Sequence, residues 1–149
     1  MSAATGAVCG LVAITPASGF MGPISALAIG VIAGLATYFA LYWLHNYTKI
    51  DDTLGVWPAH GIGGFVGALL TGIFAEKVIN ISGDNGLLFG NAGQFGIQAL
   101  VVIVAASYAF VVTYVVVWII NRTVDFRVTE EEEKEGLDLA ESGEIGHVD

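Results

Sequence analysis

Long apolar runs alternate with short polar segments along this chain, and the pattern predicts membrane-spanning helices. A helix needs about 20 mostly apolar residues to cross the hydrocarbon core of a bilayer. Three segments reach that length, at residues 23–46, 56–75 and 95–120. The last is rich in Val and Ile, but a run of 26 residues without a turn signal is too long for a strand, so a helix is predicted there as well.

The first 14 residues form one more apolar stretch, which ends at the sequence TPASG. A secretory signal peptide would begin with basic residues, whereas the first Lys or Arg of this chain is Lys49. We therefore expect residues 1–14 to be the end of another apolar helix whose preceding half is missing.

Charge is concentrated at the C-terminal end of the chain. Residues 122–149 hold ten acidic and three basic side chains, whereas residues 1–48 contain no Asp, Glu, Lys or Arg. We predict a transmembrane part over residues 1–121 and an acidic tail over residues 122–149. A charge run poor in aromatic residues is typical of a solvated segment, although EEEEKEGLDL also has the pattern of a short helix that could dock on the membrane part. No basic patch is present that would neutralise the phosphates of a nucleic acid.

The distribution of basic residues favours a cytoplasmic tail. With three full crossings, the loop 47–55 and the tail lie on the same side of the membrane. The loop 76–94 lies on the other side, and its only basic residue is Lys77. The side of the tail holds Lys49, Arg122, Arg127 and Lys134. The positive-inside rule then predicts a cytoplasmic C-terminus.

His60 is an ionisable ring inside an apolar, glycine-rich run, VWPAHGIGG. In a soluble protein a lone histidine is more often a packed core residue. In a membrane span, ionisable residues usually face a cavity, a pathway or the interior of the helix bundle. Pro58 removes a backbone donor just before the ring, which favours an irregular helix start that lines a cavity. Gly61 and the glycines after it leave space beside the ring for another helix or a narrow file of substrate. We therefore interpret His60 as a functional residue.

Other polar residues near the apolar segments have simpler interpretations. Asp51 and Asp52 lie at the entrance of the second long helix, where carboxylates cap free N–H groups and favour the positive end of the helix dipole; attraction of a cation is a secondary interpretation. Thr15 lies where the first apolar stretch ends, either as a turn residue or as a hydrogen-bonding residue between helices. Three GxxxG pairs within the apolar segments predict close helix packing. They are Gly6/Gly10, Gly30/Gly34 and Gly63/Gly67.

Several remaining residues exclude other function classes. Cys9 is the only cysteine, so neither an intrachain disulfide nor a thiolate metal site is predicted. His45 belongs to an aromatic belt typical of the membrane interface, and His147 lies in the tail. No nucleophile–base pair, metal cluster or cofactor motif is visible, so an enzyme is not expected.

Three blocks of the sequence resemble the C-terminal part of ammonium transporters of the Amt/Mep/Rh superfamily, most of all the bacterial and archaeal Amt branch. The blocks are GAVCGLVAITPASGFMGP, DDTLGVWPAHGIGGFVGALLTGIFA and FRVTEEEEKEGLDLAESGE. They occur in the family's order and spacing and cover nearly the whole chain. The resemblance implies an all-α polytopic membrane protein, with about four C-terminal helices of an eleven-helix inverted-repeat fold.

By this resemblance the protein transports ammonium or ammonia through a hydrophobic pore in the cell membrane. His60 matches the second of two paired pore histidines, which relays protons. Val56 and Trp57 match positions close to the pore, and Thr15 matches a threonine near the conduction path. The resemblance further implies a homotrimer in the full-length form, surrounded by lipid, whose cytoplasmic face can bind a PII-type regulatory protein.

The chain also departs from the family pattern. Gly55 stands where a carboxylate is common, and Thr129 stands where many relatives have proline. The other pore histidine and most of the external cation-recruitment site are absent from this sequence. An alternative expectation is therefore a non-transporting truncated fragment, or a regulatory or packing subunit of such a transporter.

Overall fold

A computed structural model describes residues 3–124, 128–137 and 143 of the chain. Every regular element among these residues is a helix, which confirms the predicted all-α class. The chain divides into two compact units, Met1–Ala105 and Ala106–Asp149, so their boundary lies inside a helix. Arg127 and His147 lie outside the described residues. In chain order the elements are α1 (Ala3–Ile14), η1 (Thr15–Ala17), α2 (Pro23–Tyr47), η2 (Trp57–Ile62), α3 (Gly63–Phe74), η3 (Leu87–Phe89), α4 (Ala92–Thr123) and α5 (Glu130–Glu135).

Three stretches are long and apolar enough to cross a membrane, namely α2, η2 joined to α3, and α4. Helix α2 begins at Pro23, where the missing N–H and fixed φ of proline suit a first turn. Helix α4 begins before the apolar run 95–120, at Ala92, and the side chain of Asn91 caps this start by accepting a hydrogen bond from the N–H of Gln94 at 3.1 Å. Hydropathy alone does not detect such a polar first turn.

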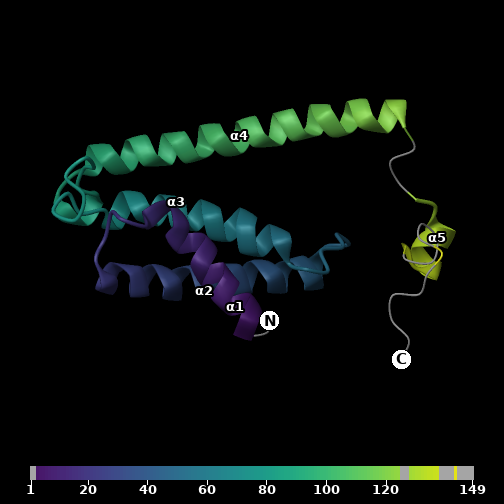
Figure 1. Cartoon of the computed structure of the whole chain (residues 1–149), viewed down its shortest axis with the longest axis horizontal. Coiled ribbons are helices and arrows are strands. Elements are labelled where there is room, and N and C mark those ends of the chain that lie inside the picture. The colour runs from purple at the N-terminus through teal and green to yellow at the C-terminus, as the bar shows by residue number, and fades with distance from the viewer. Residues whose placement is uncertain (1–2, 125–127, 138–142, 144–149) are drawn as a thin grey trace. The chain divides into compact units, whose positions relative to one another are not determined.

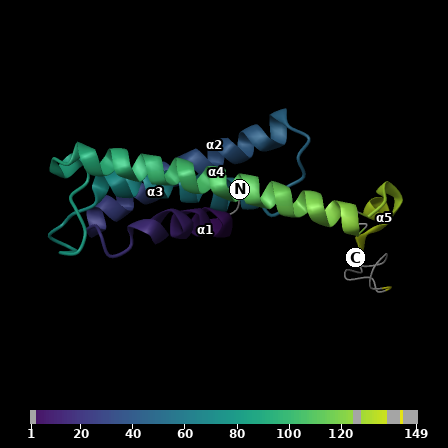
Figure 2. The same ribbon diagram turned by 90° about the horizontal axis from the view of Figure 1, so that it is seen from above.

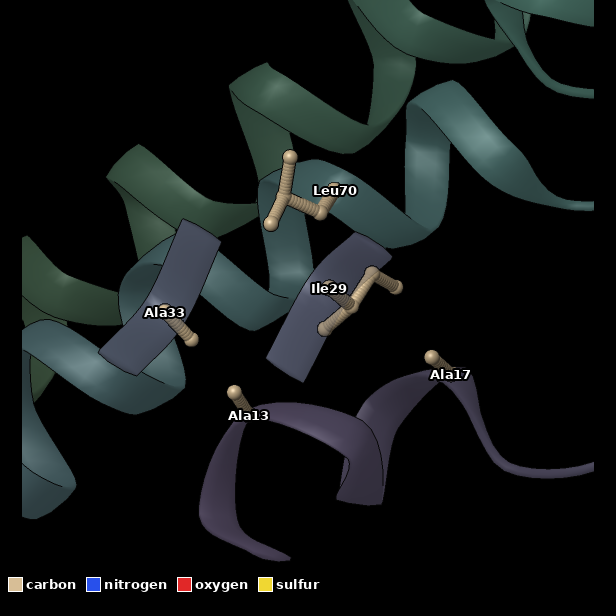
Figure 3. Close-up of a cluster of buried hydrophobic side chains, with 5 residues drawn as sticks. All are labelled: Ala13, Ala17, Ile29, Ala33 and Leu70. Carbon is tan, nitrogen blue, oxygen red and sulfur yellow. The ribbon is translucent and has the colours of Figure 1, made fainter. Parts of the chain in front are cut away.

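Helices α1, α2 and α3 pack against one another in the first unit. Figure 1 shows α1 running obliquely across α2, and Figure 2 shows it at one side of the pair. Their shared core consists largely of small side chains, which let helix backbones approach closely. Figure 3 shows this core, with two residues from α1 and η1, two from α2 and one from α3. It comprises Ala13, Ala17, Ile29, Ala33 and Leu70.

Only one of the three GxxxG pairs brings backbones together within the described chain. A Cβ on Gly63 would lie 3.4 Å from Cγ2 of Thr37 on α2 and 3.7 Å from the carbonyl oxygen of Cys9 on α1. Gly67 lies one turn further along α3 and contacts the backbone of Ala13. A Cβ on the glycines of the other two pairs would meet no atom within 4 Å. Those glycines are Gly6, Gly10, Gly30 and Gly34.

The loop after α3 is tied back to the loop that precedes α2. The N–H of Glu76 donates to the carbonyl oxygen of Phe20 at 2.7 Å. The Glu76 carboxylate accepts from the N–H of Gly22 and from the hydroxyl of Ser25, both at 3.3 Å. Both donors belong to the start of α2, so a carboxylate from a distant loop caps this helix.

The described part of the second unit includes the short helix α5, which forms within the acidic tail. Thr129 and Glu132 cap it reciprocally: the Thr129 hydroxyl accepts from the Glu132 N–H, and the Glu132 carboxylate accepts from the Thr129 N–H at 2.8 Å. The helix stops before Gly136, whose φ of +105° lies outside the range that most residues adopt.

Candidate functional site

The site begins at the turn that leads into η2. Gly55 adopts a φ of +65°, which favours glycine, and its N–H donates to the carbonyl oxygen of Asp52 at 3.0 Å. The two carboxylate oxygens of Asp52 accept from the N–H groups of Val56 and Trp57, each at 2.8 Å. Asp52 therefore caps the new helix with both oxygens. The neighbouring Asp51 instead accepts from the Thr53 hydroxyl at 2.9 Å.

The first turn and a half of this helix is a π-helix, η2. Pro58 lies inside it and has no N–H to donate. The N–H of Gly63 donates to the carbonyl oxygens of both Pro58 and His60, which closes the wider turn. The sequence predicted an irregular helix start here, but no residue pattern distinguished a π-helix. Wide turns of this kind are frequent at functional sites.

His60 lies in η2 and lines two cavities. The larger, which we call the groove, has a volume of about 660 Å³, and the second cavity has a volume of about 350 Å³. Val56 also lines both. The groove is lined by Trp43, Leu44, Ile50, Asp51, Asp52, Val56, Trp57, His60 and Gly61. The second cavity is lined by Ala4, Thr5, Val8, Leu54, Val56, Ala59 and His60.

Two indole rings form one side of the groove. The ring centroids of Trp43 and Trp57 lie 6.2 Å apart, with the planes tilted by 42°. The Trp57 ring also covers Gly61, because a Cβ on Gly61 would lie 3.4 Å from Cδ1 and 3.7 Å from Nε1 of that ring. Trp57 thus lies next to Gly61, at a distance that a side chain larger than that of alanine would disturb.

The structure brings together most of the residues singled out from the sequence. Asp51, Asp52, Val56, Trp57 and His60 all line the groove. Thr15 lines neither the groove nor the second cavity. Its hydroxyl donates to the carbonyl oxygen of Leu11 at 2.7 Å, within its own helix.

Residues from other helices complete the site and were not expected from the sequence. Trp43 comes from α2, and Thr5 comes from α1. Trp43 lies two residues before His45, in the stretch that was interpreted only as an interfacial aromatic belt, and Thr5 carried no signal of its own. Both enter the site through the packing of α1 and α2 around η2.

The groove offers largely apolar walls, the imidazole of His60 and the carboxylates of Asp51 and Asp52. No group of three or more His, Cys, Asp or Glu side chains that could hold a metal ion occurs among the described residues. Many large apolar side chains of α2 and α4 are exposed on the chain. Such extensive apolar surface is typical of contact with lipid or with further protein.

Comparison with known proteins shows what the whole chain is similar to. The model of the Ammonium Transporter Family matches residues 1–147. An ammonium transporter of Bacillus subtilis is 38% identical over 149 residues, which is all of this chain and 37% of that protein. Ammonium transporter Amt1 of Archaeoglobus fulgidus is 40% identical over 144 residues, or 97% of this chain and 36% of that protein.

The similarity extends to a solved structure. The crystal structure of Candida albicans Mep2 superposes with a TM-score of 0.76 at 33% sequence identity, over 86% of this chain and 29% of that chain. The chain thus spans about a third of the length of the curated relatives it matches.

Proposed function

This chain belongs to the Ammonium Transporter Family, and we propose that it supplies the His60-bearing part of a pore that carries ammonium or ammonia across the cell membrane. The relatives described above are named as ammonium transporters. The helices of the chain are those of a multi-pass membrane protein. The observation that carries the proposal is the position of His60, an ionisable ring that lies in an apolar span and lines two cavities.

The mechanism follows from the energetics of a cation in an apolar passage. Moving a bare ion into hydrocarbon is unfavourable by tens of kcal/mol in the Born estimate. The passage avoids this if ammonium gives up its proton, crosses as neutral ammonia and regains a proton on the far side. An imidazole suits the relay because each ring nitrogen can donate or accept a proton. Since His60 borders both the groove and the second cavity, it can exchange a proton with a solute in either one.

The other groove residues have supporting roles in this proposal. Val56 and Trp57 form apolar walls beside His60, and Asp52 fixes the backbone of both through its two hydrogen bonds. Asp51 and Asp52 also bring negative charge to the lining of the groove, which attracts a cation. For Thr15 we propose only a place near the path, on the α1 side.

The assembly belongs to the same proposal. We propose a homotrimer in the full-length form, embedded in lipid through its exposed apolar faces. The distribution of Lys and Arg supports a cytoplasmic C-terminus in this proposal. A PII-type regulatory protein would then bind at the cytoplasmic face.

The experiment measures ammonium flux in the native polypeptide that carries this sequence, produced in a host that lacks other ammonium uptake. His60→Ala is expected to lower flux by roughly tenfold or more, because it removes the proton relay. His45→Ala is the matched control, since His45 lies on α2 and lines neither the groove nor the second cavity. Equal flux and equal selectivity in wild-type protein and His60→Ala would overturn the role of His60. A complete absence of flux in the wild-type protein would instead favour the non-transporting alternative.

A further inference from the structure

The groove contains an aromatic contact between two helices that the proposed transport function does not explain. Trp57 emerges from the start of η2, where Asp52 fixes its backbone N–H. Its indole covers Gly61 one turn later and contacts Trp43 of α2. Trp57, Gly61 and Trp43 line the groove together with His60.

We propose that Trp43 and Gly61 hold the Trp57 indole in place, and that the held indole limits the size of the ammonium-type solute that reaches His60. This inference rests on the proposed transport function. It assigns Trp43 and Gly61 as positioning residues that act through Trp57.

The first step is that the indole of Trp57 lies over Gly61 of its own helix. A Cβ on Gly61 would already be in van der Waals contact with the ring, at 3.4 Å from Cδ1. The ring therefore lies over Gly61 at a distance that still admits the methyl group of alanine. A side chain longer than alanine at this position would have to occupy the space of the ring.

The second step is that Trp43 provides a contact from a different helix. The two ring centroids are 6.2 Å apart and tilted by 42°, within the range of favourable aromatic pairs. With contacts from η2 and from α2, rotation of the indole requires the loss of one of them. The Trp57 side chain is still 45% exposed on this chain, so part of it remains available to line the passage.

The third step concerns selectivity. The indole lies on the same helix as His60, three residues away along the chain, and shares the groove with it. A rigid ring beside the relay excludes a solute by its volume, and one added methyl group is the smallest difference that such a wall can distinguish. Methylammonium, which is one methyl group larger than ammonium, is therefore the appropriate probe.

The experiment compares methylammonium uptake with ammonium uptake in the native polypeptide. Trp43→Ala removes the ring contact and is expected to raise the methylammonium-to-ammonium ratio by about threefold or more, since a freed indole admits the larger solute. Trp43→Phe keeps an aromatic ring and is expected to retain the wild-type ratio. Phe39→Ala is the matched control, because Phe39 is an exposed aromatic residue one turn earlier on α2 that does not line the groove. If the wild-type protein takes up no methylammonium, any methylammonium uptake by Trp43→Ala counts as the expected rise in the ratio.

A pair of substitutions at Gly61 tests the same inference from the other helix, should Trp43→Ala fail to accumulate. Gly61→Ala places its Cβ at ordinary contact distance and is expected to leave the ratio unchanged. Gly61→Val displaces the indole and is expected to raise the ratio. An altered protein yield with an unchanged or lowered ratio in both Trp43→Ala and Gly61→Val would show a purely structural role and overturn the inference. That result differs from failure of the proposed function, in which the wild-type protein itself would carry no ammonium.

Discussion

The backbones of Gly67 and Ala13 are in direct contact where α3 crosses α1. A Cβ on Gly67 would overlap the carbonyl oxygen of Ala13 and lie 2.7 Å from its Cα. The obstructing atoms are backbone atoms of another helix, so a change of side-chain rotamer cannot make room. This contact fixes the distance between α1 and the helix that carries His60.

Gly67→Ala is therefore expected to destabilise the protein by about 3 kcal/mol, the upper end of the range for overpacked sites. The measurement is thermal unfolding in detergent. Gly64→Ala serves as the control, because its Cβ would lie 3.9 Å from Cγ1 of Val12, an ordinary contact. Equal stability of the two variants would contradict this account of the α1–α3 packing.

Asp52 and Asp51 are adjacent carboxylates with different structural roles. Asp52→Ala removes the acceptors of the Val56 and Trp57 N–H groups and is expected to weaken the helix start by about 1 kcal/mol. Hydrogen exchange at these two amides should then accelerate by about fivefold. Asp51→Ala should leave them unchanged, since Asp51 accepts only from the Thr53 hydroxyl among the bonds seen. Equal acceleration in both variants would argue for a general electrostatic effect in place of a specific cap.

Glu76 is expected to stabilise the start of α2 from a distant loop. Glu76→Ala removes the acceptor for Gly22 and Ser25 and should lower the free energy of unfolding by about 1 kcal/mol. Glu76→Gln keeps an acceptor oxygen and should lose less. The control is Asp84→Ala, which breaks an exposed ion pair with Lys77 at 3.4 Å and should have little effect. A larger loss of unfolding free energy in Asp84→Ala than in Glu76→Ala would refute this role.

The cap of α5 predicts a dependence on pH. The N–H of Thr129, and secondly its hydroxyl, hold the pKa of the Glu132 carboxyl below its ordinary value. Because the folded-state pKa is lowered, the stabilisation is present above the ordinary pKa and is lost as the pH falls through the lowered value. A carboxyl ¹³C NMR titration measures this shift.

Thr129→Pro removes both donors and is expected to return the pKa of Glu132 toward its ordinary value. Thr129→Val removes the hydroxyl alone and should return the pKa of Glu132 only part of the way toward its ordinary value. Glu132→Gln should remove the part of the pH dependence of the α5 helix content that the reciprocal cap contributes. If Glu132 titrates identically in the wild-type protein and in Thr129→Pro, the reciprocal cap does not form in solution.

Much of the fold follows from local sequence. The apolar runs predicted the long helices because a helix satisfies its own backbone hydrogen bonds wherever it lies, so length and hydropathy suffice. The position of His60 within such a run pointed to a functional site for a comparable reason. An ionisable ring needs a polar or open environment, and an apolar span provides one only at a cavity or at a helix interface.

The residues that other helices contribute to the site could not be predicted from local sequence. Trp43 and Thr5 reach the cavities beside His60 because α1 and α2 pack around η2. The groove therefore depends on contacts between residues far apart in the sequence. The covering of Gly61 by Trp57 depends likewise on the rotamer of one side chain, which Trp43 stabilises from another helix.

The glycine pairs show most clearly what the sequence predicts and what only the packing of the helices decides. All three GxxxG sequences have the same spacing, and by itself the sequence determined that each could accept a close neighbour. Only the tertiary structure decided that Gly63 and Gly67 face α1, while Gly30 and Gly34 meet no atom within 4 Å of the described chain. The physical reason is that a missing side chain permits close approach, whereas the packing of whole helices determines which backbone arrives there.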